Sequence, residues 1–305
     1  MPPKIGRRIS DEKLSKATYD RMVRFSELRL QADRKIHTER QKRLDPVYNE
    51  LTKVIRNSPE MAGVVRAIDS LPQPDKPELP PPDRGQKRRV IPYREPLVRA
   101  DSIPYAFPPP YDTGNIWTDL EGGGNAWWSG PTADANTGEM GYEMKPGIGQ
   151  SGSMACWVAV GLMLSVPRTP YTRIDFSVTT SLDWSYTEFS TTWRETKGNL
   201  WIGQYADLYD ENGSFVENAL ATQNVIASWD DRNLFGNGGN KGSQNPVTIP
   251  LLQVSVPVAG SWDGGTIDYR CWLGGSGLAD GSQQQSGCQA QMDAVCSQLV
   301  ADIFF

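Results

Sequence analysis

Apolar and polar side chains alternate over thirteen consecutive positions in residues 174–186. One series is Ile174, Phe176, Val178, Thr180, Leu182, Trp184 and Tyr186, and the other is Asp175, Ser177, Thr179, Ser181, Asp183 and Ser185. Because successive side chains of a β-strand point to opposite faces, this period of two predicts a strand with one buried and one solvated face. Such a strand has to pair within a sheet and bury its apolar face against a second layer.

Other segments after residue 150 also predict strands. They are residues 154–166, 200–209, 214–228, 252–258, 266–273 and 289–303. The segment 154–166 is apolar on both faces, which predicts a central strand. Residues 210–213 read Asp-Glu-Asn-Gly and predict a hairpin turn. In the last segment the apolar positions change from even to odd numbers, which predicts a bulge near Ser297.

Seven or eight short strands joined by turn-rich connections are typical of an antiparallel β-sandwich. The predicted fold class is therefore mainly β, with a C-terminal sandwich of jelly-roll or immunoglobulin-like type. An N-terminal α-helical arm and a proline-rich extended linker precede it in this prediction. We expect the end of the chain at Phe305 to be built into a sheet, because it directly follows a strand.

The chain changes in composition near residue 112. Residues 1–100 hold 23 Lys and Arg against 14 Asp and Glu, whereas the later residues hold 8 against 22 and all ten Trp. Two parts this different predict two structures joined by a spacer. The predicted domains are a basic helical docking arm over 1–71, a proline-rich linker over 72–111 and a β-sandwich head over 112–305.

The arm is predicted to contain three helices. Residues 11–43 predict a long helix with Ser10 as its N-cap and acidic residues in its first turn. A second helix is predicted to start at Asp45–Pro46 and a third, short one at Ser58–Pro59, because a capping residue followed by proline is a common helix start. The long helix carries a narrow stripe formed by Leu14, Thr18, Met22, Phe25, Leu28, Ala32 and Ile36.

A narrow apolar stripe on a long charged helix does not form a core by itself. It needs another copy, another protein or the β domain as its partner. The docking residues inferred from this argument are Leu14, Met22, Phe25, Leu28, Ile36, Leu51 and Val54. The Arg and Lys residues of the arm could instead attract nucleic acid or an anionic membrane. Acidic residues are interleaved at helical spacing, which favours a solvated, salt-bridged face, so neither partner is expected.

The linker contains twelve prolines between Pro72 and Pro110. This density excludes a helix or a central strand and predicts an extended, polyproline-like strut. The linker includes a basic segment, GQKRRVIPYREP. This segment could contact a neighbouring subunit or could be solvated.

No pattern in the chain predicts catalysis, so we expect no enzyme, no catalytic residue, no metal and no cofactor. The one histidine, His37, lies in the arm and is predicted to be solvated, which leaves no His to activate a Ser or Cys in the head. Acidic residues that could meet as a glycosidase pair are Asp183, Glu188, Glu195, Asp230 and Asp231. Oxygen-rich loops at 207–212 and 229–233 leave calcium as an alternative.

The four cysteines, Cys156, Cys271, Cys288 and Cys296, form no CxxC pair. They are predicted to be buried, reduced thiols within strands. No run of 18 apolar residues is present, and the N-terminus lacks the apolar core of a signal peptide. We therefore expect synthesis in the cytoplasm without a signal peptide.

Tryptophan is more abundant in the head than a core of this size needs. Trp127 and Trp128 lie in a predicted loop, as does Trp229 beside Asp230 and Asp231. Aromatic rings next to acids and amides are typical of sugar sites, so these five residues are the candidate ligand-binding set and a glycan receptor is a candidate partner. The alternative is that the rings fill the ends of the sandwich or a subunit interface.

The order of arm, strut and β head predicts a structural or attachment component of a larger assembly, such as a virion, a phage tail or a similar particle. It is expected to be homo-oligomeric, to bind copies of itself and other subunits, and to form part of that particle. A carbohydrate-binding module on a linker is one alternative. An effector or toxin loaded into a delivery particle through its arm is the other.

Overall fold

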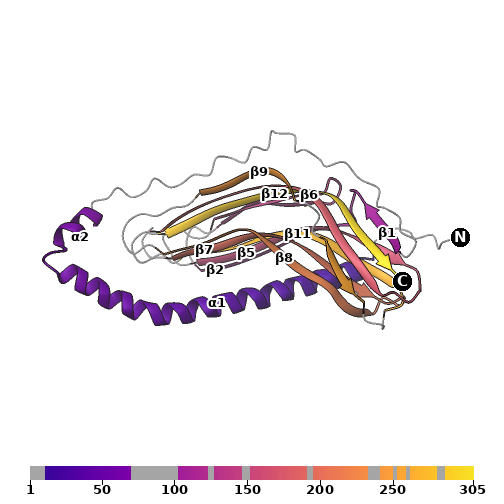
Figure 1. The fold of residues 1–305 in the computed structure, drawn as a ribbon, viewed down its shortest axis with the longest axis horizontal. Coiled ribbons are helices and arrows are strands. Elements are labelled where there is room, and N and C mark those ends of the chain that lie inside the picture. The colour runs from indigo at the N-terminus through magenta and orange to yellow at the C-terminus, as the bar shows by residue number, and fades with distance from the viewer. Residues whose placement is uncertain are drawn as a thin grey trace.

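The computed structural model describes residues 11–69, 102–122, 127–145, 152–190, 195–232, 241–249, 253–258, 262–279 and 286–305. The helices are α1 (Glu12–Asn57) and α2 (Ala62–Asp69). The strands are β1 (Ser102–Phe107), β2 (Thr113–Gly122), β3 (Trp127–Asp134), β4 (Glu139–Lys145), β5 (Gly152–Val166), β6 (Arg173–Ser190), β7 (Glu195–Tyr209), β8 (Phe215–Arg232), β9 (Lys241–Ile249), β10 (Val254–Pro257), β11 (Gly265–Ala279) and β12 (Ser286–Phe304). Two sheets stack face to face, and α1 runs along the outside of one of them (Figure 1).

Within the described residues, all strand pairs are antiparallel. Sheet A has the order β2-β5-β11-β7-β8. Sheet B has the order β10-β6-β12-β4-β3, with β1 also paired to β12 and β9 also paired to β6. Their inner faces enclose the main core, in which Phe176 of sheet B packs on Tyr269 of sheet A with ring centroids 5.0 Å apart. The chain is therefore mainly β and sandwich-like, as its alternation predicts.

Strand β6 confirms the predicted alternation only on its inner face. Ile174, Phe176 and Val178 are buried between the sheets as expected. The opposite face is not fully solvated, because Ser181 and Ser185 are also buried. These are short side chains flanked by longer ones on β12, where Gln291 is the cross-strand partner of Ser185.

Other local predictions in the sheets are confirmed. Strand β5 lies inside sheet A between β2 and β11, and most of it is buried on both faces. The turn after β7 closes with the Asp210 amide donating to the Ser214 carbonyl at 2.9 Å, and Gly213 takes the positive φ of 77° that glycine tolerates best. Strand β12 shifts register between Cys296 and Gln298, where the bulge is predicted.

The helical segment differs from its prediction at two places. The N-cap is Asp11, whose carboxylate accepts from the Lys13 and Leu14 amides, while Ser10 lies outside the described residues. Helix α1 also continues through Pro46 to Asn57, so the predicted helix start at 45–46 is wrong. A proline inside a helix removes one hydrogen bond and favours bending, and α1 curves toward its C-terminal end (Figure 1). The short third helix is confirmed as α2.

The sandwich begins earlier than predicted. Residues 102–107 form β1, which pairs with the end of β12, so the boundary at 112 is wrong. Pro104 is accommodated because β1 has β12 as its partner and lies at a sheet edge, where a missing amide is tolerated. Residues 72–101 of the proposed linker lie outside the described residues.

Candidate functional site

Helix α1 lies on the outer face of sheet A and forms a third layer. Its buried face follows steps of four residues through Leu14, Thr18, Met22, Ser26 and Leu30. Because an α-helix has 3.6 residues per turn, each step of four residues rotates the position by about 40° around the helix axis. The line of buried residues therefore winds slowly around α1. The surface of a twisted sheet rotates in a similar way along its length, so it can stay in contact with this line of residues. The contact therefore follows α1 over several turns.

Aromatic rings of sheet A surround Met22, which is fully buried. Trp157, Trp201 and Trp272 come from three different strands and pack on one another, with ring centroids 4.5 Å apart for Trp201–Trp272 and 6.1 Å apart for Trp157–Trp272. Tyr19 of α1 adds an edge contact to Trp157 at 5.6 Å. The sequence thus places the largest side chains of the outer face under the helix.

Two glycines make room for these rings. A Cβ atom on Gly274 would lie 1.9 Å from Cζ2 of Trp201, and one on Gly203 would lie 2.1 Å from Nε1 of Trp272. Both indoles therefore lie against bare backbone, which keeps the outer face flat enough for α1 to pack on it.

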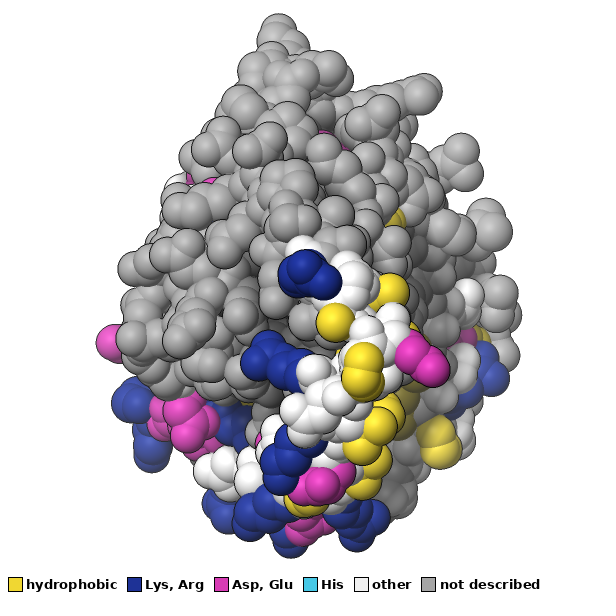
Figure 2. Space-filling view, turned by 90° about the vertical axis from the view of Figure 1, so that its left-hand side faces the viewer, with side chains coloured by type: hydrophobic (Ala, Val, Ile, Leu, Met, Phe, Trp, Pro, Cys, Tyr) yellow, Lys and Arg dark blue, Asp and Glu magenta, His cyan; other side chains and the backbone are white. Residues whose placement is uncertain are grey.

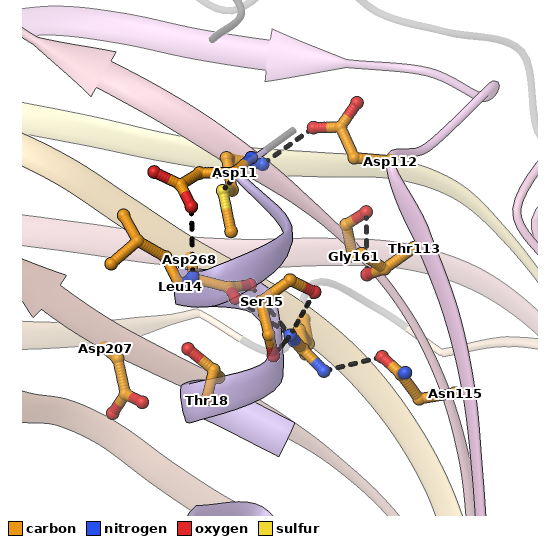
Figure 3. Close-up of polar contacts among 12 residues, drawn as sticks. Asp11, Leu14, Ser15, Thr18, Asp112, Thr113, Asn115, Gly161, Asp207 and Asp268 are labelled. Atoms are coloured by element: carbon orange, nitrogen blue, oxygen red, sulfur yellow. Dashed lines mark hydrogen bonds and ion pairs between the residues drawn. The ribbon is translucent and has the colours of Figure 1, made fainter. Parts of the chain in front are cut away.

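A polar cluster centred on Arg270 fastens the first turns of α1. The guanidinium is fully buried and donates to Asp268 Oδ2 at 2.8 Å, to Asn115 Oδ1 at 2.6 Å, and to the carbonyl and hydroxyl of Ser15 at 2.8 and 3.1 Å (Figure 3). Burial alone would lower the pKa of Arg270, but Asp268, together with the nearby Asp207 and Tyr209, raises it. One buried cation thus joins α1 to β2 and β11.

A second buried carboxylate, Asp207, lies directly opposite Asp268 in the pairing of β7 and β11. It accepts from Arg21 Nε at 2.8 Å and from Asn218 Nδ2 at 3.0 Å. Burial raises the pKa of Asp207, and the bonds to Asn218 and Arg21 oppose that rise. The Arg21 guanidinium also donates to the hydroxyl of Tyr209, which shares a 2.7 Å hydrogen bond with Thr18. Burial raises the pKa of Tyr209 to about 12.

Ion pairs continue the attachment along α1. Arg34 lies 2.7 Å from Glu121 and 3.3 Å from Asp119, both on β2. Arg40 lies 3.1 Å from the buried carboxylate of Glu195 and 3.3 Å from Asp230.

His37 belongs to the same end of the contact. Its Nδ1 lies 3.8 Å from Glu195, and its side chain is only 12 % exposed. The prediction that His37 is solvated is therefore wrong, because a histidine one turn from Arg40 faces the same carboxylate.

The end of α1 extends past the sandwich, where α2 follows it (Figure 1). Val47, Leu51 and Val54 on this end are 60, 42 and 65 % exposed, and Val64 of α2 is 45 % exposed. Viewed from this side, apolar side chains line the projecting helix, and Lys and Arg side chains lie beside them (Figure 2). We call these four residues the exposed end stripe.

The predicted docking residues separate into two groups. Leu14 and Met22 are buried against the chain's own sheet, and Phe25 lies with its ring 6.2 Å from Trp272. Of the three partners expected for the arm, namely another copy, another protein or the β domain, the β domain is the partner of α1 up to Arg40. The remaining docking residues, Leu28, Ile36, Leu51 and Val54, are exposed.

Two members of the predicted ligand set, Trp229 and Asp230, have described side chains, and Trp229 is not in an exposed site. Trp229 and Asp230 lie in β8 rather than in a loop. Trp229 is buried and stacks on Tyr186 with ring centroids 4.9 Å apart, while Asp230 binds Arg40. Trp127 and Trp128 fall in β3 and Asp231 in β8, but their side chains lie outside the described part of the chain.

Arg270, Asp268, Asp207 and Trp272 are the site residues that the sequence reasoning missed. A signal was present in the predicted strand 266–273, where Asp268, Arg270 and Trp272 alternate with Tyr269 and Cys271. Large and charged residues on both faces indicate a strand that is covered on both sides. Each carboxylate of this cluster already has a cationic partner, so the cluster is suited to holding α1.

The four cysteines are free and buried in strands β5, β11 and β12, as predicted. Among the described residues, no group of three or more His, Cys, Asp and Glu could hold a metal ion. Neither described helix has the length and apolarity needed to cross a membrane.

No protein-family model matches the chain, and no curated protein matches it. Among solved structures, it is similar to the enzymatically active domain of tailspike protein 4 from bacteriophage CBA120, with a TM-score of 0.16, 12 % identity and coverage of 60 % of this chain and 19 % of that one. The structure of infectious bursal disease virus, Gx strain, gives a TM-score of 0.14 and 12 % identity, with coverage of 64 % of this chain and 40 % of that one. The family 11 carbohydrate-binding module of Clostridium thermocellum gives a TM-score of 0.13 and 11 % identity, with coverage of 66 % of this chain and 91 % of that one. Similarities this slight do not define a shared fold.

Proposed function

We propose that this protein is a structural or attachment component of a larger assembly, and that copies of it associate through the projecting end of α1 and α2. In this proposal the β-sandwich is the displayed part, and the assembly is a virion, a phage tail or a similar particle. The exposed end stripe is the observation that carries the proposal.

The spacing of the apolar residues near the end of α1 supports a helical partner. Leu44, Val47, Leu51 and Val54 follow one another at intervals of three, four and three residues, which is the spacing of a helix–helix seam. All four are Val or Leu, and three of them, Val47, Leu51 and Val54, are exposed. Burying each of these side chains in an interface would contribute roughly 1.5–3 kcal/mol. A seam of two heptads is short, so several copies acting together suit it better than one isolated pair.

The attachment of α1 to the sheet supports the same role. The ion pairs and aromatic contacts up to Arg40 fix the first half of α1 on the sandwich. The projecting end therefore leaves the head in a defined direction, which suits a part that must hold its head in a fixed orientation in an assembly.

The test is the mass of the full chain in solution, measured by size-exclusion chromatography with light scattering. We expect wild type to be larger than the 33.8 kDa of one chain and Val54→Glu to shift toward that mass. The matched control is Val225→Glu, because Val225 lies on β8 and is 54 % exposed against 65 % for Val54. A monomeric wild type, or equal effects of the two substitutions, would contradict the proposal.

A further inference from the structure

A small cavity lies between α1 and the outer face of sheet A, apart from the exposed end stripe. Its volume is about 30 Å³. The lining includes Ser26 of α1, and Trp117, Trp157, Asn199, Trp201 and Gln223 of the sheet. Three tryptophans from β2, β5 and β7 thus meet amide and hydroxyl side chains under one helix.

Three buried polar atoms at this cavity have no hydrogen-bond partner within the described part of the chain. They are Nε1 of Trp157, Oδ1 of Asn199 and Oε1 of Gln223. The Trp157 side chain is fully buried, so bulk water does not reach its N–H group. A buried polar group without a partner destabilises the protein, so an occupant that supplied the missing bonds would be favoured.

The chemistry of the three atoms defines the occupant. The indole N–H needs an acceptor, while the two amide oxygens need donors. A hydroxyl group can accept from the indole N–H and donate its one hydrogen to one of the amide oxygens, whereas a carboxylate or phosphate would supply acceptors alone. The charged residues of the lining, Arg29 and Asp33, are exposed and opposite in sign, so the site does not favour a charged ligand.

The volume limits what can enter. A water needs about 10–15 Å³ measured in this way, so about 30 Å³ accommodates two small groups such as the carbon and oxygen of a hydroxymethyl arm. A whole sugar ring does not fit. Trp117 is only partly buried, lies on the edge strand β2 and stacks on Trp157 with ring centroids 6.2 Å apart. Its ring offers an apolar surface for the rest of a sugar residue.

We propose that this cavity binds the hydroxymethyl arm of a neutral sugar residue, whose ring rests against Trp117. The site uses residues other than the Trp127, Trp128 and Trp229 set and is independent of how the chain assembles.

Probes that differ in one group test this assignment on the full-length protein. Cellotetraose carries hydroxymethyl groups, and xylotetraose has the same ring and linkage without them. Binding is measured by calorimetry and by the fluorescence of the cavity tryptophans. We expect cellotetraose to bind at least about tenfold more tightly than xylotetraose, the effect of about one hydrogen bond and its packing.

Variants then locate the binding. Gln223→Met and Asn199→Leu keep the size of each side chain and remove its acceptor, so the variant that loses the amide oxygen bonded to the hydroxyl should weaken cellotetraose binding by about tenfold. The matched control is Gln291→Met, because Gln291 on sheet B also has a buried amide oxygen without a partner. We expect it to bind like wild type.

Four results would overturn the assignment. They are no binding of cellotetraose by the folded wild type, equal binding of both tetrasaccharides, unchanged binding by Gln223→Met and Asn199→Leu, and glycerol binding as tightly as cellotetraose. The last result would mean that the cavity takes any small hydroxyl compound and that Trp117 contacts no sugar ring.

Discussion

Arg21 of α1 and Asp207 of β7 form an ion pair at 2.8 Å in which the carboxylate side chain has no exposed surface. A surface ion pair contributes little to stability, whereas a buried carboxylate without its cation is costly. This pair therefore makes the position of α1 a condition for the stability of the sheet beneath it.

Met22→Ala is expected to lower the free energy of unfolding by about 2–5 kcal/mol, because it leaves a cavity between three indole rings. Urea unfolding followed by circular dichroism measures the change. Leu28→Ala is the control on the same helix, since Leu28 is 59 % exposed and should change stability by less than about 0.5 kcal/mol. Equal losses in the two variants would mean that α1 does not pack on the sheet in solution.

Arg270→Met is expected to cost about 3–5 kcal/mol, because it leaves the Asp268 carboxylate buried without its cation. Adding Asp268→Leu to that variant should restore part of the loss, since the orphaned charge is then gone as well. Thermal and chemical unfolding of the two variants provide the measurement. A double variant less stable than Arg270→Met would show that the charge itself is not the cause.

The stability of the protein is expected to depend on pH through Asp207. Burial raises its pKa in the folded state above the ordinary 3.8, so the folded protein holds this proton more tightly than the unfolded chain. As the pH falls through the folded pKa toward 3.8, wild type should therefore gain stability relative to Asp207→Asn. Above the folded pKa that contribution is lost. Unfolding free energies of both proteins between neutral pH and about pH 4 test this, and an opposite trend would contradict it.

The cysteines are expected to resist thiol reagents in the folded protein. All four are buried, and burial raises the pKa of the Cys156 and Cys288 thiols, which removes the reactive thiolate. Ellman's reagent should therefore react slowly with the native protein and with four thiols in denaturant. Rapid labelling of the native protein would show that the sandwich opens readily.

The strands were predictable because their signal is local. Alternation over 174–186 places β6, and the change from even to odd apolar positions in 289–303 places the bulge of β12. These features depend on the neighbours of each residue in the chain. Pro46 shows the limit of such rules, because α1 continues through a residue that normally ends a helix.

The site was not predictable because its parts lie far apart in the sequence. Nothing near Ser26 or Leu30 indicates that their partners are tryptophans on sheet A. The narrow stripe correctly indicates that α1 needs a partner, but a stripe does not identify which one. The slow rotation of the contact also explains why the sequence analysis chose Phe25 and Leu28, when the sheet contacts Ser26 and Leu30.

The bond from Arg270 to the carbonyl of Ser15 spans 255 positions of the chain. During synthesis, the segment that becomes the first turns of α1 leaves the ribosome long before β11 exists. Met22 and Leu14 therefore stay uncovered in the growing polypeptide until nearly all of it has been translated. In this order of synthesis, the uncovered apolar side chains of α1 can bind other molecules. Correct folding therefore depends on how quickly the later strands are made and cover them.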